Sequence, residues 1–306
     1  MSAVLLSYLN PLSMNYYLID DQGAKLGGAE MTLEAIAEAG RTLGHSVVTV
    51  PTKGVHSLIT DDPPYFIFGN ICDLKDRQDG EAILDIIRKG RFSKIEFDYG
   101  YIPYRGTIPY QAFTGHSYAP ERHRDTQMHI LYEEIRKHAE HLFFMSRAQR
   151  KIHSAHFNDG RDKDMVLSSC FTDDNLNLMR EIREKDNERS PSWIVLEGRD
   201  KWQQWCKGTH VAMQYLESQG ITHKVVRTST HRELLELFGS HAGHMLMPNI
   251  HDTCPRTAIE ATLCGAELAY NTNVQHMGEA WTQGTVEEAE EYIRQAPFRF
   301  WEQIAC

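Results

Sequence analysis

Short apolar runs alternate with longer amphipathic helical patterns along this chain, and this alternation restricts the fold more than any other feature. The first apolar run, YYLID at residues 16–20, is followed by a loop and by a helical segment from Ala29 to Leu43. Gly44 ends that helix, and a second strand pattern, HSVVTV, follows at residues 45–50. This order of strand, helix and strand predicts parallel sheets with helices on both faces.

The same alternation continues through the rest of the chain. Further strands are expected at residues 65–69, 94–98, 141–145, 164–168, 193–197, 223–227, 244–248 and 266–271. Helices are expected at residues 208–219, 231–239 and 255–264, and an amphipathic tail helix is interrupted at Pro297. The polar stretch 172–192 ends in Ser-Pro-Ser, so it predicts a short helix and a linker between two domains.

Length and composition agree with two domains of ordinary globular character. The chain has 306 residues, 41% of them hydrophobic, and no apolar run approaches the roughly 20 residues needed to span a bilayer. The N-terminus has no basic segment before its short apolar stretch, so we expect it to begin the fold and not to be a signal peptide. The six cysteines are scattered without a C-x-x-C pair, which favours a reducing compartment, the cytoplasm, and disfavours a zinc site. A net charge of −10 disfavours a protein that coats nucleic acid, but it leaves room for a local basic groove.

Paired glycines stand where the first strand-to-helix loop, KLGGAE, meets its helix. Glycine lets the backbone approach a ligand closely, and the start of the helix offers free N–H groups and a positive dipole end. Gly27 and Gly28 are therefore candidate ligand contacts, although a tight turn alone would also use them. The loop lacks the G-x-G-x-x-G pattern, which disfavours a nicotinamide-dependent dehydrogenase.

Two cations stand in the first connection of the second domain, WIVLEGRDKWQQWCKGTH. Arg199 is expected just after a strand, and Lys207 at the start of the next helix. An arginine fork and a lysine point charge at the carboxyl edge of a sheet suit a diphosphate. For either residue alone, a solvated surface charge is the alternative.

The stretch NIHDTCPRTAIEATLCG places Asp252 eight residues before Glu260, with Pro255 between them. Proline suits the first turn of a helix because its missing N–H is no loss there, and Asp252 or Thr253 could cap that helix. The exposed amides of the first turn would then form an anion site. Glu260 could accept hydrogen bonds from the vicinal hydroxyls of a ribose; a capped helix with one exposed glutamate is the alternative.

The order and spacing of these motifs resemble the retaining GT-B glycosyltransferases of family four, which include many mannosyl- and glucosyltransferases. GGAE at the head of the first helix, followed by LGHSVVTV, resembles their first motif. Gly198-Arg199 with Lys207-Gly208 resembles their diphosphate-binding pair, and D-x7-E followed by ATLCG resembles their E-x7-E motif. FFMSRAQRKIH at residues 143–153 is similar to the strand and helix that close their N-terminal domain. The resemblance extends from residue 16 over nearly the whole chain.

This resemblance implies an α/β fold of two Rossmann-like, doubly wound domains that face a cleft, with a C-terminal helix returning to the N-terminal domain. The N-terminal acceptor domain would comprise residues 1–172 and helix 290–306, and the donor domain residues 173–289. The implied activity is retaining transfer of a hexosyl or pentosyl group from a nucleotide-diphosphate sugar, foremost a UDP-sugar, to a hydroxyl acceptor. The resemblance implies neither a metal nor a further cofactor.

The resemblance also implies a role for each donor-site residue. Gly27 and Gly28 would lie against the donor phosphates or the reacting sugar. Arg199, Lys207 and Asp252 form the implied catalytic set, since fixed cations that neutralise the departing diphosphate contribute directly to rate. Glu260 would hold the ribose. Further donor contacts would come from the start of the same helix: Thr253, Cys254, Pro255 and Arg256.

Two departures from the family pattern stand out. Asp252 replaces the usual first glutamate and is one methylene shorter, which bears on the sugar hydroxyl that it reaches. The chain is also short for this family, so we expect reduced acceptor-binding loops.

A stretch rich in basic and aromatic residues, 88–124, is the candidate acceptor surface. Cations for phosphate and rings for stacking are typical of nucleic-acid surfaces. One acceptor hypothesis is therefore DNA with a hydroxylated or hydroxymethylated base flipped toward the cleft, by analogy with small viral glycosyltransferases. The candidate acceptor contacts are Asp98, Tyr99, Arg105 and His116. A loop whose tyrosines pack on the core and whose charges are solvated is the alternative.

Other functions are compatible with the same residues. The acceptor could be a small saccharide, a lipid or a protein, or the chain could bind a nucleotide sugar without catalysis. An epimerase with the same fold is a further alternative, but its usual catalytic carboxylates have no counterpart here. A viral enzyme of this kind would act in the host cytoplasm, and the sequence does not indicate an oligomeric state.

Overall fold

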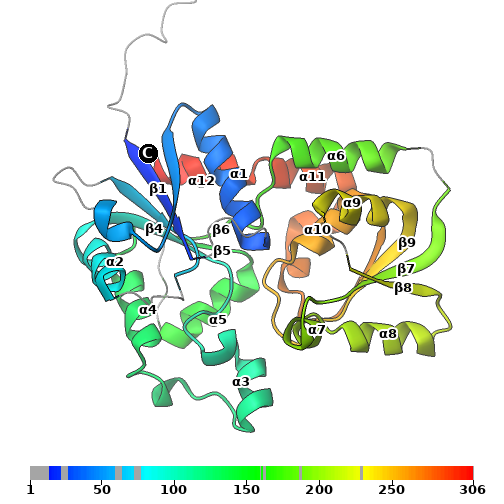
Figure 1. Ribbon diagram of the computed structural model, residues 1–306, viewed down its shortest axis with the longest axis horizontal. Helices are drawn as coiled ribbons and strands as arrows, with labels where there is room; N and C mark the ends of the chain where they lie inside the picture. Colours follow the sequence, from blue (N-terminus) through cyan, green and yellow to red (C-terminus); the bar gives the residue numbers. More distant parts are fainter. Residues whose placement is uncertain are drawn as a thin grey trace, which may run out of the picture.

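Six parallel strands form the N-terminal sheet of the computed structural model. The structure describes residues 14–21, 27–58, 64–71, 77–158, 160, 163–185, 188–227 and 230–305, and Figure 1 shows the arrangement of their helices and strands. The strand order is β2-β1-β3-β4-β5-β6, and every neighbouring pair is parallel. The strands are β1 (Asn15–Asp20), β2 (Ser46–Pro51), β3 (Tyr65–Phe68), β4 (Arg91–Glu96), β5 (His141–Phe144) and β6 (Asp164–Val166).

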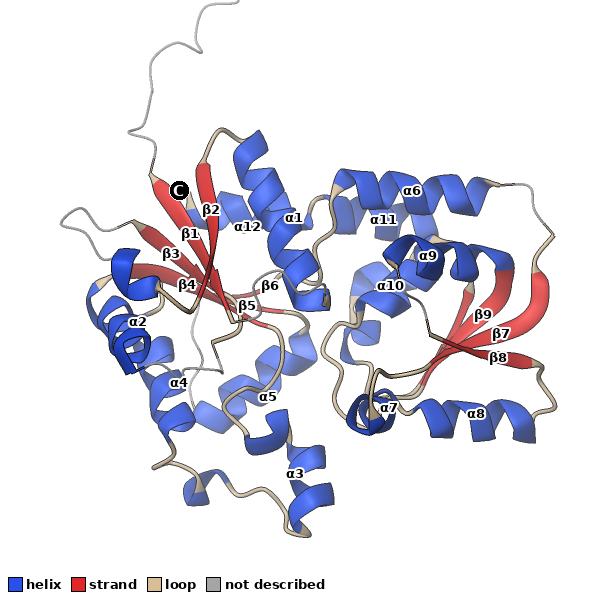
Figure 2. Cartoon of the chain, viewed as in Figure 1, coloured by secondary structure: helices blue, strands red, loops and turns tan. Residues whose placement is uncertain are grey.

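Helices cover both faces of this sheet (Figure 2). They are α1 (Gly28–Thr42), α2 (Arg77–Lys89), α3 (Thr107–Thr114), α4 (Gln127–His138) and α5 (Arg147–Phe157), with short turns η1 (Val55–Leu58), η2 (Pro103–Arg105) and η3 (Pro120–Arg122). Successive strand residues enter opposite layers: Phe143 packs in the core beneath α1, and Phe144 packs in the core beneath α2 and α4. A strand that is buried on both faces reads as a continuous apolar run, which is why the sequence shows these strands clearly.

Four parallel strands form the second sheet, in the order β10-β9-β7-β8. They are β7 (Ser190–Leu196), β8 (His223–Val226), β9 (His241–Leu246) and β10 (Glu267–Tyr270). The helices and turns of this half are α6 (Asp173–Glu184), α7 (Lys201–Lys207), α8 (Thr209–Ser218), α9 (His231–Ser240), α10 (Arg256–Leu263), η4 (Gln275–Gly278), η5 (Ala280–Gln283) and α11 (Val286–Arg294).

The C-terminal helix α12 (Ala296–Ile304) returns to the N-terminal sheet, as expected (Figure 1). Its Trp301 is buried and donates a hydrogen bond from Nε1 to the carbonyl oxygen of Ile36 at 2.7 Å. The indole lies directly on α1, because a Cβ added at Gly40 would come within 2.3 Å of it. The preceding helix α11 instead contacts α6 and α10, so the chain crosses back between Arg294 and Ala296.

Two local expectations were wrong, and one helix was not expected. The helix expected at residues 208–219 is present as α8, but a separate helix, α7, precedes it, and Gly208 separates the two. The Ser-Pro-Ser at residues 190–192 belongs to β7 and not to a linker. Pro297 lies in the first turn of α12, where proline is well tolerated, so the tail breaks before it at Gln295. Among the described helices, none is long and apolar enough to cross a membrane.

Candidate active site

The carboxyl edges of the two sheets face each other, and the loops that follow β4 and β9 touch directly. Thr253 Oγ1 donates a hydrogen bond to the carbonyl oxygen of Phe97 at 2.6 Å. The hydroxyl of Tyr99 donates to Gln275 Oε1 at 2.8 Å, and its ring lies 6.0 Å from that of His251. Open parallel sheets bind ligands beyond the carboxyl ends of their strands, so this junction is the place to look for a site.

Lys207 and Asp252 meet at this junction although 45 positions separate them in the sequence. Lys207 Nζ lies 2.7 Å from Asp252 Oδ2, and the lysine side chain remains 45% exposed. Partial burial opposes the charge of Lys207 and Asp252 favours it, and the balance raises the pKa of the ammonium group. The Asp252 backbone is fixed by a hydrogen bond from its N–H to Asn273 and by one from Gln275 to its carbonyl oxygen.

Two glycines permit this pairing. Gly208 has a φ of +65°, and a Cβ there would lie 1.6 Å from the carbonyl oxygen of Met247. A Cβ at Gly198 would lie 2.4 Å from the backbone nitrogen of Gln204. Only glycine lets α7 pack this closely against both ends of its loop, and that packing places Lys207 beside Asp252.

Arg199 lies at the opposite end of α7 from Lys207, which ends the helix and does not begin one as expected. Arg199 precedes the N-cap residue Asp200, and the seven-residue helix α7 spans about 10 Å at 1.5 Å per residue, so only the long side chains of Arg199 and Lys207 can converge on one ligand. The Arg199 side chain is exposed and pairs with no acidic residue in the described parts of the chain. Its backbone N–H donates to Gln203 Oε1 at 3.1 Å.

The start of α10 differs from the predicted cap. Pro255 occupies the N-cap position with extended backbone angles, and no side chain caps the helix, so Asp252 and Thr253 do not have that role. Thr253 and Cys254 are buried, and Ser169 Oγ donates a hydrogen bond to the carbonyl oxygen of Cys254 at 2.9 Å. The first turn of α10 is therefore positioned by contacts with the N-terminal half of the chain.

Arg256 is a buried cation at this interface. Its guanidinium donates to the carbonyl oxygen of Cys170 and lies over the Phe171 ring, with Cζ 3.6 Å from the ring centroid. A Cβ added at Gly28 would lie 3.3 Å from Arg256 Cδ, so the glycine loop of the first domain abuts α10. The structure thus brings Gly28 and the D-x7-E motif together.

Glu260 is 2% exposed and has a histidine and an arginine as its neighbours. His231 Nε2 lies 2.9 Å from Glu260 Oε1, and Arg256 Nε lies 3.4 Å from the same oxygen. Burial alone would raise the pKa of Glu260, but the hydrogen bond from His231 and the charge of Arg256 outweigh it and lower the pKa. His231 was missed by the sequence analysis, since it contacts Glu260 only because α9 packs on α10.

The glycine loop is described only in part. Gly27 is the N-cap residue of α1 in extended conformation, and a Cβ there would collide with the Glu30 carboxylate at 2.3 Å. Burial raises the pKa of Glu30. Residues 22–26, which include the first part of KLGGAE, lie outside the described residues.

The four candidate acceptor contacts do not form one surface. Asp98 pairs with Arg105, which has a φ of +61° and is half-exposed. Tyr99 is buried in the domain junction, so it does not present its ring to an acceptor there. His116 is exposed just beyond the end of α3.

The basic-aromatic stretch 88–124 also divides in two. Its first half belongs to the folded core: Phe92 and Tyr101 are fully buried, and each basic residue is paired with an acid. Those pairs are Arg88–Glu134, Lys89–Asp85, Arg91–Glu140 and Lys94–Glu96. Acids therefore already engage the cations of this half, and only the part from Tyr104 onward presents exposed aromatic rings.

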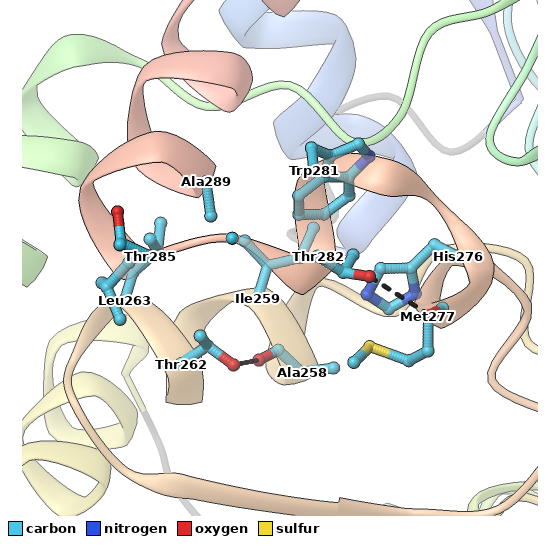
Figure 3. A pocket seen from close by; sticks show the side chains of 12 residues that line it. Ala258, Ile259, Thr262, Leu263, His276, Met277, Trp281, Thr282, Thr285 and Ala289 are labelled. Carbon is cyan, nitrogen blue, oxygen red and sulfur yellow. Dashed lines mark hydrogen bonds between the residues drawn. The ribbon is translucent and has the colours of Figure 1, made fainter.

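Two hollows in the surface lie away from the junction of the two sheets. A small apolar pocket of about 50 Å³ separates α10 from η4, η5 and α11, and Ile259, Met277 and Trp281 line it (Figure 3). It is too small for a nucleotide sugar, since ligand pockets are typically about 300 Å³ or more. An open hollow of about 650 Å³ lies at the amino ends of β5 and β6, beside Lys137 and Lys163, away from the carboxyl edge.

In the described residues, no cluster of three or more His, Cys, Asp or Glu could hold a metal ion.

Comparison with known proteins places the fold. No family model matches the sequence, and no curated protein matches it significantly. The structure is similar to sucrose-phosphate synthase from Thermosynechococcus elongatus, with a TM-score of 0.58, 12% identity, and coverage of 95% of this chain and 94% of that one. It is also similar to an α-glucosyltransferase in complex with UDP and a 13-mer DNA containing a HMU base, with a TM-score of 0.51, 10% identity, and coverage of 95% and 90%.

A third similar structure is Anabaena HepE in complex with UDP and glucose, with a TM-score of 0.50, 13% identity, and coverage of 95% and 98%. These proteins share the GT-B architecture of two parallel-sheet domains, and the fold of this chain is GT-B. The fold expected from the motif order is therefore confirmed.

Proposed function

We propose that this protein is a glycosyltransferase that transfers a sugar from a nucleotide-diphosphate sugar to a hydroxyl group. The observation that carries the proposal is the Lys207–Asp252 pair, which the GT-B fold assembles where the carboxyl edges of two parallel sheets meet. The glycine contact between Gly28 and Arg256 brings the start of α1 to the same junction.

In this proposal Lys207 and Arg199 neutralise the diphosphate as it leaves. Negative charge on the departing phosphate grows toward the transition state, so a fixed ammonium group there lowers the barrier more than it strengthens ground-state binding. Asp252 orients Lys207 through their 2.7 Å contact and lies at the end of the site that would hold the sugar. We further propose retention of the anomeric configuration and no requirement for a metal, as the family resemblance implies.

The donor proposed here is a UDP-sugar, held by residues of the C-terminal domain, 173–289. UDP is named in the complexes of two of the similar structures, the DNA-bound α-glucosyltransferase and HepE. Glu260 would face the ribose of the donor. The ribose hydroxyls would then approach a carboxylate that His231 and Arg256 already contact. A cytoplasmic location is proposed as well, supported by the free and buried Cys170, Cys206, Cys254 and Cys264.

The acceptor proposed is a hydroxylated or hydroxymethylated DNA base. Two observations support this proposal. Residues 104–124, the second half of the basic-aromatic stretch, present exposed aromatic rings, and one similar structure is a complex with DNA. A small saccharide, a lipid or a protein acceptor would require different surroundings at the same donor site.

Donor binding can be tested by thermal unfolding with UDP-, GDP-, ADP- and CDP-sugars. A ligand that binds only the folded state raises the melting temperature, and saturation at a hundredfold excess over Kd corresponds to about 2.7 kcal/mol. We expect a UDP-sugar to raise it most. A chain that no nucleotide sugar stabilises would contradict the proposal.

A further inference from the structure

Four aromatic side chains meet where the N-terminal domain approaches α7. The Tyr104 ring stacks on Phe113 with centroids 5.5 Å apart, and Phe113 lies 5.1 Å from Trp202 and 5.6 Å from Trp205. The two tryptophans stack on each other at 5.5 Å. Tyr104, Phe113, Trp202 and Trp205 are called the aromatic platform below.

This platform is unusually open to solvent. Tyr104 is 50% exposed, Phe113 53% and Trp202 41%. Single exposed apolar residues are common, but a contiguous group of large rings marks an interaction surface. Tyr104 also has a φ of +60°, a conformation that costs a non-glycine residue on the order of 1 kcal/mol or more. The fold holds the ring outward at that cost.

The platform is rigidly joined to the candidate donor site through α7. Trp202 and Trp205 lie on the same helix that ends at Lys207. Asn249 fixes that end by donating from Nδ2 to the carbonyl oxygen of Trp205 at 2.7 Å and from its backbone N–H to that of Cys206 at 3.0 Å. A molecule that rests on the platform is therefore held at a set position relative to Lys207 and Asp252.

The charge of the segments that carry the platform favours a polyanion. Segments 104–124 and 199–207, from which the four rings come, contain six Lys or Arg against two Asp or Glu, whereas the whole chain has a net charge of −10. Two of the six cations, Arg105 and Lys207, are paired with Asp98 and Asp252. Arg199 and Lys201 are exposed at the start of α7, beside Trp202.

We propose that the aromatic platform binds the nucleic-acid acceptor by stacking an unpaired base beside the transfer site. Aromatic faces stack on any base, and neighbouring cations track the phosphates, whereas a neutral saccharide would gain no ionic attraction from the basic surroundings. This inference rests on the proposed glycosyltransferase function and specifies how its acceptor is held.

The test measures binding of a single-stranded oligodeoxynucleotide, the matching duplex and a neutral malto-oligosaccharide to the full chain. We expect tighter binding to the single strand, with quenching of tryptophan fluorescence. Trp202→Ala and Phe113→Ala should each weaken that binding on the order of tenfold or more, while Trp202→Phe, which keeps a ring, retains most of it. Tyr215→Ala is the matched control, because Tyr215 is 49% exposed on α8 outside the platform.

Stabilisation by the UDP-sugar is measured on the same variants, so a failure of this inference is distinguishable from a failure of the proposed function. Unchanged oligonucleotide binding in Trp202→Ala and Phe113→Ala would overturn the inference, as would no oligonucleotide binding by the unaltered chain. Preferential binding of the malto-oligosaccharide would also overturn it and would assign the platform to a saccharide.

Discussion

At the scale of single residues, Gly208 determines whether Lys207 can reach Asp252. The resemblance drew attention to the Lys-Gly pair, but the reason for the glycine lies in its φ of +65° and its contact with the Met247 carbonyl group. The sequence indicates Asp252 because its spacing to Glu260 follows a motif. The sequence does not indicate His231, because this histidine approaches Glu260 only through the packing of two helices, and no nearby residue pattern predicts that contact.

We predict that Gly208→Ala destabilises the fold by about 3 kcal/mol or more, because a Cβ 1.6 Å from a carbonyl oxygen forces the backbone apart. The control is Gly220→Ala. Gly220 has the same φ of +65°, but nothing lies within 4 Å of an added Cβ. It should cost only about 1 kcal/mol for the left-handed conformation. Urea unfolding measures both, and equal losses would refute the steric explanation.

At the scale of elements, α7 shows what periodicity alone cannot resolve. Asp200 caps this helix by accepting a hydrogen bond from the Gln203 N–H at 2.8 Å, and Gly208 ends it after two turns. The apolar pattern of α8 dominates the sequence signal in this region. The short helix that carries Lys207 therefore went unpredicted, although its cap and its terminal glycine are both visible in the sequence.

The packing of α9 on α10 through His231 and Glu260 predicts a pH dependence of stability. The folded pKa of Glu260 lies below the ordinary value, about 4.3, so its stabilisation is present above that pH and is lost as pH falls through the lowered pKa. We predict that Glu260→Gln costs about 3 kcal/mol at pH 7, since it leaves buried Arg256 without its anion. The cost should shrink below about pH 4.

This dependence is measured as the difference in unfolding free energy between the variant and the unaltered chain from pH 3 to 7. Glu236→Gln is the control, because the Glu236–Arg232 pair on α9 is solvent-exposed and should contribute little at any pH. A Glu260→Gln cost that stays constant across this range would show that Glu260 is not a low-pKa anion in the folded state.

At the scale of the whole molecule, the motif order predicts the GT-B fold because each motif marks a carboxyl edge of one sheet. The contacts that join the two halves were not predictable in the same way. Thr253 with Phe97 and Phe113 with Trp202 are paired by tertiary packing, and residues so far apart leave no periodic signal. The structure also shows that the first half of residues 88–124 is part of the core, whereas the half from Tyr104 onward carries the exposed rings of the platform. Composition alone does not distinguish these two halves.

The central claim is that Lys207 promotes departure of a nucleoside diphosphate from a bound sugar donor. The most direct measurement is the rate of UDP release from UDP-sugars by the unaltered chain, by Lys207→Ala and by Lys224→Ala, an exposed lysine on β8 that serves as control. We predict that the unaltered chain and Lys224→Ala release UDP at similar rates, and that the rate of release falls by about a hundredfold or more in Lys207→Ala. Equal rates for all three, or no release from any donor, would contradict the claim.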